Sequence, residues 1–206
     1  SDADQRRRGV GIGCMWYGCG NTSMANPSII HIRLRRDGSV TVYSGAIDMG
    51  QGPNTTIMQM AADGLGIEMS RLELVNGDTD LTADAGKSSA SRVCYVSGNA
   101  VKLAGEDLRS QILRLANVSG AAEIEFGGAR LVVRDGSARR EIALAALPAD
   151  DDGVVLTGEG TFSPPTTIPE NERGTGMPYA TYAFAAQIAE VEVDVDLGTV
   201  CVLRIA

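Results

Sequence analysis

Aromatic residues and histidine are scarce in this chain, and both shortages limit what it can be. Phe, Trp and Tyr make up 4% of the 206 residues, and His31 is the one histidine. A core must therefore rely on aliphatic side chains, and the 25 glycines allow backbones to approach closely. His31 falls on the polar phase of an alternating run, so we expect a surface residue rather than a metal ligand.

A surplus of positive charge is also missing. The formal net charge is -8 at pH 7, which argues against a nucleic-acid partner because phosphates would not be neutralised. The basic cluster Arg6-Arg7-Arg8 is expected to be a solvated segment.

No apolar run approaches the ~20 residues that span a bilayer, so no membrane partner is expected. The polar start shows no signal peptide, and we expect a cytoplasmic location.

The four cysteines are too scattered for a structural zinc site. Cys14 and Cys19 are separated by four residues, but no second pair of ligands completes a set. Cys94 and Cys201 stand apart from them and from each other. We therefore expect all four to be buried thiols or local packing residues, which fits a reducing compartment.

A β-hairpin and two helices are the local structures with the clearest signals. Two alternating runs joined by Asp37-Gly38 predict the hairpin. A helix begins at Pro53, with Asn54 or Thr55 as its cap, and ends at the glycines 64 and 66. A second helix is predicted over Ser91–Ala116, because apolar residues recur there at helical spacing.

These elements predict an α+β fold with mixed sheets and two long helices. We expect residues 1–117 to form the main lobe, 118–165 a small insert or second lobe, and 166–206 a strand pair that returns to the main domain. Strands are expected around the turn Asp196-Leu197-Gly198, and a short helix near residues 140–149.

Two helix entrances are candidates for binding chemistry. Gly50-Gln51-Gly52 leads into the first helix, and Ser88-Ser89-Ala90-Ser91-Arg92 leads into the second. Free backbone N–H groups and the helix dipole make such an entrance suited to an anion. Each also has an ordinary structural explanation: the first as a turn, the second as a helix cap. A shared phosphate-bearing ligand is the functional interpretation.

The same two segments resemble motifs of the molybdenum hydroxylase family, which includes xanthine dehydrogenases and aldehyde oxidases. The family motif G-x-x-[DE]-x-G-Q-G-x-x-T is matched by Gly45, Asp48, Gly50-Gln51-Gly52 and Thr55. The run SSASRVCYVSGNAV is similar to a second family motif at a helix start. The last segment, from GTGMPYATY onwards, resembles the strand pair that precedes the family's C-terminal cofactor segment. The likeness covers residues 8–206, and GIGCMWYGCGN is most similar to the nicotinate-dehydrogenase type.

This resemblance implies a molybdopterin cofactor, in some members extended by cytosine dinucleotide, whose dithiolene holds the molybdenum. The metal then needs almost no protein side-chain ligands. By analogy, Gly50, Gln51 and Gly52 line the pterin and phosphate, and Ser88, Ser89, Ala90, Ser91 and Arg92 form the opposite cradle. Ala90 falls where the family backbone approaches the metal. Iron–sulfur and FAD groups are expected on partner subunits or domains.

The resemblance assigns no catalytic residue to this chain. The family's catalytic glutamate, in a G-x-G-E context, and the G-Q-x-x-G-G run before it are expected after Ala206. An earlier cofactor loop is expected before Ser1. Glu159 in TGEGT superficially mimics the base, but its strand context does not match.

Three functions remain open from the sequence. The chain is expected to be a fragment or split subunit of an enzyme that hydroxylates N-heterocycles or aldehydes, without turnover on its own. It could alternatively be an assembly or binding module, or an α+β domain without a cofactor. Flanking sequence would distinguish a fragment from a split subunit.

Overall fold

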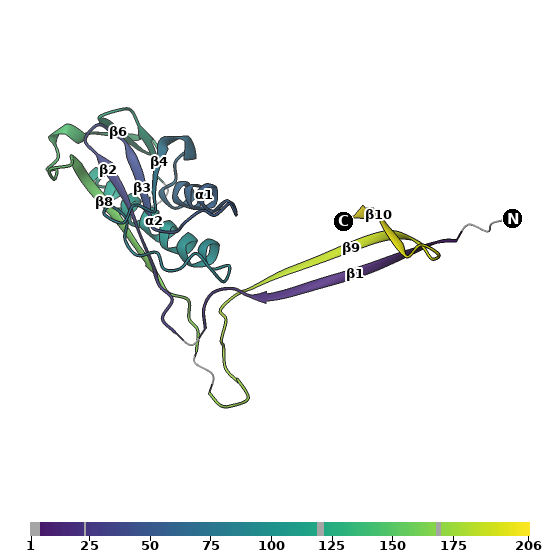
Figure 1. Cartoon of the computed structure of the whole chain (residues 1–206). Helices are drawn as coiled ribbons and strands as arrows, with labels where there is room; N and C mark the ends of the chain where they lie inside the picture. The colour runs from purple at the N-terminus through teal and green to yellow at the C-terminus, as the bar shows by residue number, and fades with distance from the viewer. Residues whose placement is uncertain (1–4, 23, 119–121, 168–169) are drawn as a thin grey trace. The chain divides into compact units, whose positions relative to one another are not determined.

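The computed structural model describes residues 5–22, 24–118, 122–167 and 170–206. The chain divides into two compact units. Unit 1 combines Ser1–Cys19 with Ala180–Ala206, and unit 2 is Gly20–Tyr179. The first and the last strands of the described chain therefore belong to unit 1 (Figure 1). None of the helices in the described ranges is long and apolar enough to cross a membrane.

Unit 2 is built on a four-stranded mixed sheet with the order β4-β3-β2-β8. β2 is antiparallel to β3 and β8, whereas β3 and β4 run parallel. A parallel pair needs a crossover connection, and the helix α1 provides it. The bounds are β2 (Ser28–Arg35), β3 (Val40–Ser44), α1 (Pro53–Leu65), β4 (Leu72–Asn76) and β8 (Val154–Phe162).

The predicted hairpin at Asp37-Gly38 is confirmed by the β2–β3 pair. The Oδ1 atom of Asp37 accepts hydrogen bonds from the backbone N of Ser39 at 2.9 Å and from its hydroxyl at 2.7 Å. These bonds favour the carboxylate, so they hold the pKa of Asp37 below its usual value.

Asp37→Asn should lower stability only where Asp37 is ionised. The folded-state pKa of Asp37 lies below the unfolded value, so its contribution is present above the unfolded pKa and is lost as pH falls through the folded pKa. Because the side chain is exposed, we expect a loss of only about 0.5 kcal/mol. Urea unfolding of both proteins at neutral pH and near pH 2 checks this, since a difference that persists in acid would contradict it.

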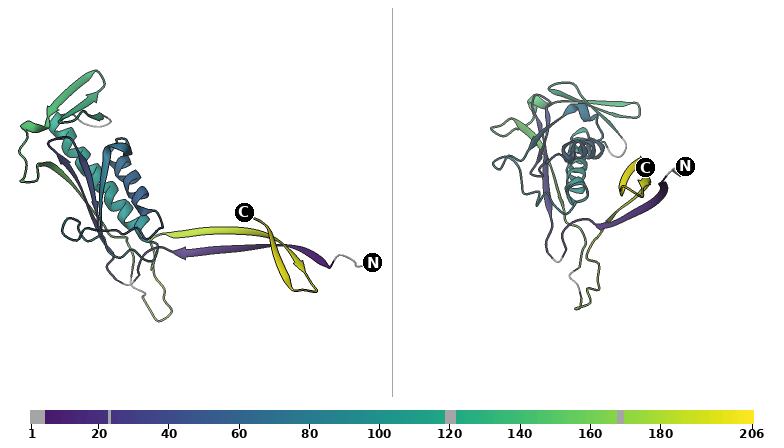
Figure 2. Two further views of the ribbon diagram at one scale, coloured as in Figure 1. Left: turned by 45° about the horizontal axis from the view of Figure 1, so that its top comes forward. Right: turned by 45° about the vertical axis from the view of Figure 1, so that its right-hand side comes forward.

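Both long helices lie on one face of this sheet (Figures 1 and 2). Ile30, Ile32 and Leu34 of β2 are fully buried, and they alternate with half-buried polar residues. α2 (Gly98–Ala116) packs against β8 and β2 and against α1. Gly160 of β8 makes this approach possible, because a Cβ there would collide with backbone atoms of Ala100 and Ala104.

The helix boundaries match the predictions except at one cap. α1 ends at Gly66, which has φ 76° and donates its N–H to the carbonyl of Ala62. Its start was predicted to be capped by Asn54 or Thr55, and this is wrong. The cap is Gly52, which adopts the left-handed conformation and makes no side-chain cap hydrogen bond. The chain passes directly from Gly52 into Pro53 at the first helical position.

The second helix begins with one π-helical turn, Val93–Ser97, and continues as α2. The predicted helix over Ser91–Ala116 is therefore confirmed. Beside it lies a three-stranded antiparallel sheet of β5 (Glu123–Phe126), β6 (Arg130–Asp135) and β7 (Ala138–Ala143). The short helix expected near residues 140–149 is present only as the 3-10 helix Leu144–Ala146, because β7 occupies the first part of that stretch.

Unit 1 is a three-stranded antiparallel sheet in the order β1-β9-β10. β1 (Arg6–Gly18) pairs along its whole length with β9 (Tyr182–Asp194), and β10 (Thr199–Ile205) pairs with the other edge of β9. The predicted strands around Asp196-Leu197-Gly198 are confirmed. Figure 1 shows β1 and β9 as one long pair.

The two units differ from the predicted domain ranges, which include residues 1–4, 23, 119–121 and 168–169 outside the described part. β8 lies within the range 118–165, yet it is a strand of the main sheet. The strand pair in 166–206 pairs with β1, which lies within the predicted range 1–117 but belongs to unit 1 and not to the sheet of unit 2. Long-range pairing decides both points, and local sequence patterns do not report it.

The expectation of buried or locally packed thiols is wrong for three of the four cysteines. Cys14, Cys94 and Cys201 are exposed, and Cys19 is half-buried. Cys14 and Cys201 lie on strands of unit 1, where neither face of the sheet is buried. Cys94 borders a cavity described below.

Candidate functional site

The two helix entrances meet at one cavity. Its volume is about 480 Å³, within the roughly 300–1,000 Å³ of small-molecule sites. The backbone N–H of Ile47 donates to the hydroxyl of Ser88 at 2.8 Å, so the two segments are directly joined. Loop and helix residues from both entrances line the cavity: Met49, Gln51, Pro53, Thr56, Ser88, Ser89, Ser91, Arg92, Val93 and Cys94.

The first entrance is a loop held open by two glycines. Gly50 has φ 106° and Gly52 has φ 79°, values that residues with a Cβ rarely adopt. A Cβ at either position would meet nothing within 4 Å, so space is open beside both. Their N–H groups are already used, because the carboxylate of Asp48 accepts from Gly50 at 2.8 Å and from Gly52 at 3.3 Å.

Gln51 borders the cavity and also braces its own loop. Its Oε1 accepts from the backbone N of Met49 at 2.6 Å, and its Nε2 donates to the carbonyl of Ile47 at 3.2 Å. A primary amide has two N–H donors and two oxygen lone pairs. One donor and one lone pair therefore remain for a ligand.

The second entrance contains consecutive residues in a strained conformation. Ala90 and Ser91 both have φ 53°, which costs a non-glycine residue about 1–3 kcal/mol. The carbonyl of Ala90 is held by the N–H of Gly20 at 2.7 Å. Ser88, Ser89 and Ser91 line the cavity, whereas Ala90 does not. Within the described chain, the hydroxyls of Ser89 and Ser91 make no hydrogen bonds, so they are available to a ligand.

Arg92 borders the cavity, but its charged group is committed to the backbone. The residue is fully buried, and its guanidinium donates to four carbonyl oxygens. They belong to Ala85 at 2.6 Å, Lys87 at 3.0 Å, Asn26 at 3.2 Å and Pro27 at 2.7 Å. Arg92 thereby ties residues 26–27 and 85–87 to the start of the second helix.

The surroundings of Arg92 are adapted to a buried cation. Burial lowers the pKa of Arg92, and the negative charge of Asp84 opposes that shift. Gly86 lies directly over the guanidinium, since a Cβ there would come within 2.6 Å of Nη1. Arg92 therefore stabilises the backbone around the predicted cradle, and its guanidinium does not point to the cavity as a free donor to a phosphate.

Comparison with known proteins identifies the family. The family model described as "Molybdopterin cofactor-binding domain" matches residues 1–206. The chain belongs to this family. It is the molybdopterin cofactor-binding domain of the xanthine dehydrogenase and aldehyde oxidase type, covering part of a large subunit, and the predicted fold class is confirmed.

Relatives of this molybdopterin cofactor-binding domain are much longer proteins. The probable hypoxanthine oxidase XdhD of Escherichia coli (strain K12) is 30% identical over 205 residues, which is 94% of this chain and 19% of that protein. Aldehyde oxidase 1 of Oryctolagus cuniculus is 28% identical over 192 residues, 92% of this chain and 13% of that protein. The aldehyde oxidoreductase structure from Desulfovibrio desulfuricans ATCC 27774 has a TM-score of 0.74 at 26% identity, covering 98% of this chain and 20% of that one.

Sequence reasoning missed half of the cavity lining in this molybdopterin cofactor-binding domain. Met49, Pro53, Thr56, Val93 and Cys94 border the cavity beside the predicted residues. Thr56 follows Gly52 by one helical turn, so a search along the helix face would have found it. Val93 and Cys94 belong to the π-helical turn. Apolar spacing predicts a helix there but does not distinguish a π-helical turn from an α-helix.

The donor set fits a molybdopterin better than a directly bound metal. Among the described residues, no group of three or more His, Cys, Asp and Glu side chains is placed to hold a metal ion. The cavity instead offers hydroxyls, an amide, a thiol and aliphatic carbon. A cofactor that brings its own sulfur ligands to molybdenum needs only such a wall.

Proposed function

We propose that the cavity between the two helix entrances binds the molybdopterin of a molybdenum-dependent hydroxylase or dehydrogenase that acts on N-heterocycles or aldehydes. The observation that carries this proposal is that Gln51 of the first entrance and Ser88, Ser89 and Ser91 of the second line a single cavity. The chain supplies one part of the cofactor wall, and the rest of the large subunit supplies the remainder.

The chain's own residues bind and orient the cofactor. The hydroxyls of Ser89 and Ser91 and the remaining Nε2 hydrogen of Gln51 serve its polar edge. Met49 and Val93 offer apolar carbon to its ring system. Gly50 and Gly52 leave open space beside the first loop for the pterin. The contact of Ala90 with the metal stays a prediction from the resemblance, because Ala90 does not line the cavity. Ser88 and Arg92 hold the wall in place.

The bound group supplies the redox chemistry, in which a carbon is hydroxylated with oxygen from water and two electrons leave the substrate. The chain contributes no catalytic base in this proposal. Glu159 is exposed on β8 beside His31, at 4.0 Å, and does not line the cavity. A glutamate elsewhere in the large subunit is the expected base, and iron–sulfur and flavin partners take the electrons. A cytosine-dinucleotide form of the pterin is compatible with the same wall.

Cys94→Phe should block cofactor loading. Cys94 is exposed at the border of the cavity, so a bulky ring there occupies the space assigned to the pterin. We expect molybdenum and pterin content per polypeptide of the purified full-length protein to fall at least about tenfold. Metal analysis and pterin fluorescence after oxidation measure this without relying on activity.

Ser110→Phe is the matched control. Ser110 is exposed on α2 away from the cavity, so the same ring should leave cofactor content unchanged. Equal cofactor content in both variants would contradict the assignment of this cavity.

An assembly or binding module is the second candidate function. It is favoured by the sheet of unit 1, in which β1 and β10 are exposed over almost their whole length. Metal and pterin analysis of the purified full-length protein distinguishes cofactor binding from assembly. A protein that assembles but contains neither molybdenum nor pterin would have only the assembly role.

A further inference from the structure

The serines of the second entrance are presented by a tight turn. The backbone N–H of Arg92 donates to the carbonyl of Ser89 at 3.2 Å, which closes the turn. Its two central residues, Ala90 and Ser91, both have φ 53°. Positive φ at both central positions defines the type I′ class, in which glycine and asparagine are the usual residues because a Cβ is disfavoured there. Alanine and serine therefore need support from outside the turn.

The turn sends its serines and its central carbonyl to different places. Ser89 and Ser91 line the cavity, whereas Ala90 does not. The carbonyl of Ala90 instead accepts a hydrogen bond from the backbone N–H of Gly20 at 2.7 Å. This bond fixes the peptide plane between Ala90 and Ser91, because the carbonyl oxygen and the next N–H belong to one rigid unit. The direction of the backbone at Ser91 therefore depends on Gly20.

Position 20 suits a glycine in two ways. Gly20 is buried and has φ 99°, a value that residues with a Cβ rarely adopt. A Cβ there would lie 3.1 Å from Nδ2 of Asn26. Asn26 is 5% exposed, and its backbone carbonyl accepts from Arg92. Asn26 has little room to yield, so a side chain at position 20 would displace the backbone of Gly20 from Ala90.

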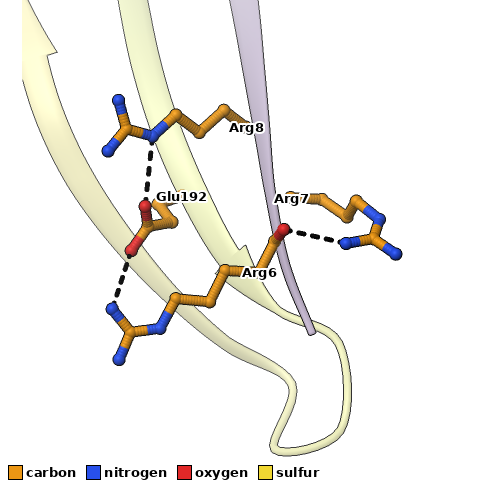
Figure 3. A network of polar contacts seen from close by, with 4 residues as sticks. All are labelled: Arg6, Arg7, Arg8 and Glu192. Atoms are coloured by element: carbon orange, nitrogen blue, oxygen red, sulfur yellow. Dashed lines mark hydrogen bonds and ion pairs between the residues drawn. The ribbon is translucent and has the colours of Figure 1, made fainter. Parts of the chain in front are cut away.

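The bond from Gly20 to Ala90 differs from the polar network of unit 1. There Arg6 and Arg8 reach the carboxylate of Glu192 at 3.2 Å and 3.1 Å, and Arg7 donates to the carbonyl of Arg6 (Figure 3). The side chains of Arg6 and Arg8 are 60% and 66% exposed, so these ion pairs stabilise little. Gly20 is buried, and a buried N–H without a partner is costly.

We propose that Gly20 is a positioning residue of the cavity. Its N–H holds the strained turn Ser89–Arg92 in the conformation that presents the hydroxyls of Ser89 and Ser91 to the cofactor. Gly20 itself does not line the cavity, so it acts through Ala90. This inference rests on the proposed function, because it concerns the same cofactor.

Gly20→Ala should lower cofactor content through the turn. We expect molybdenum and pterin per polypeptide of the purified full-length protein to fall about tenfold, because the turn loses the bond that offsets its strain. In an Ala90→Gly background, the same change at Gly20 should lower the content by no more than about twofold. Glycine at position 90 adopts positive φ without cost, so the turn no longer needs the bond.

Gly136→Ala is the matched control. Gly136 also has positive φ, 57°, and a Cβ there would meet nothing within 4 Å. It lies in the exposed turn between β6 and β7. The same substitution therefore imposes backbone strain without touching the turn at Ala90, and cofactor content should remain at the wild-type value.

Three outcomes would overturn the role of Gly20 alone. Wild-type cofactor content in Gly20→Ala would show that the turn does not depend on the bond. A tenfold loss that persists in the Ala90→Gly background would assign Gly20 to packing only. An equal loss in Gly136→Ala would be a general effect of strain. A wild-type protein that contains neither molybdenum nor pterin would end the proposed function as well.

Hydrogen exchange provides a second measurement, should Gly20→Ala not fold. In the wild-type full-length protein, the amide of Gly20 donates to Ala90. It should therefore exchange at least about tenfold more slowly than a glycine amide in an unstructured peptide. Exchange at the unstructured rate would contradict the bond, and the role of Gly20 with it, whatever the cavity binds.

Discussion

Replacing Arg92 with methionine should lower the free energy of unfolding of unit 2 by about 3–5 kcal/mol. The guanidinium is fully buried and donates to four backbone carbonyls. Methionine fills a similar volume but leaves all four acceptors without partners. Chemical denaturation of the full-length protein, followed by a probe within unit 2, measures the change.

The matched control for this prediction is Arg114→Met. Arg114 lies in the last turn of α2 and is exposed, so its loss should change stability by no more than about 0.5 kcal/mol. If Arg92→Met proved as mild as the control while cofactor content collapsed, Arg92 would be a ligand-binding residue and not a structural brace.

Gly160→Val should destabilise unit 2 by about 3 kcal/mol or more. A side chain at this position runs into the backbone of α2 at Ala100 and Ala104. A local shift of β8 would not relieve this clash, because Gly158 of the same strand approaches the backbone of α2 equally closely. Thermal or urea unfolding would report the loss.

Thr161→Val is the matched control for Gly160→Val, because it changes the β-propensity of the same strand without placing a side chain against α2. Thr161 is the next residue of β8 and is exposed, so a β-branched replacement of equal size should be nearly neutral, within about 0.5 kcal/mol. A similar loss in both variants would show that β8 tolerates no change at all, and the role assigned to Gly160 would be wrong.

Local elements could be predicted from this sequence because local chemistry determines them. Asp37-Gly38 favours a tight turn whatever strands flank it, and Pro53 and Gly66 mark the start and the end of α1. The apolar period of the second helix indicates which face is buried. These signals depend on few residues and on no distant partner.

Strand partners could not be predicted in the same way. β8 completes the sheet of unit 2 by pairing with β2, which is more than a hundred residues earlier. The run Gly158-Glu159-Gly160 invites comparison with a catalytic motif, yet these glycines are explained by their contact with α2. Their role is visible only when the helix above them is placed.

The candidate site was predicted in outline but not in its internal bonding. The sequence motifs predicted two entrances, Gly50–Gly52 and Ser88–Arg92, and residues of both line one cavity, although Gly50, Gly52 and Ala90 do not. They did not reveal that Asp48 and Gln51 satisfy much of the first loop, or that Arg92 faces carbonyls. Hydrogen-bond partners depend on backbone direction, which sequence motifs do not specify. Whether these residues bind a cofactor stays a prediction.

The pairing of β1 with β9 also affects how the protein emerges from the ribosome. Gly18 ends β1, and its partner Tyr182 is synthesised roughly 160 residues later, a delay of about 10–30 s at ordinary translation rates. During that interval Val10, Ile12 and Trp16 have no neighbouring strand. The alternating glycines reduce the β-propensity of the waiting segment, and the adjacent arginines oppose its self-association. The composition of β1 therefore suits a strand that is made first and paired last.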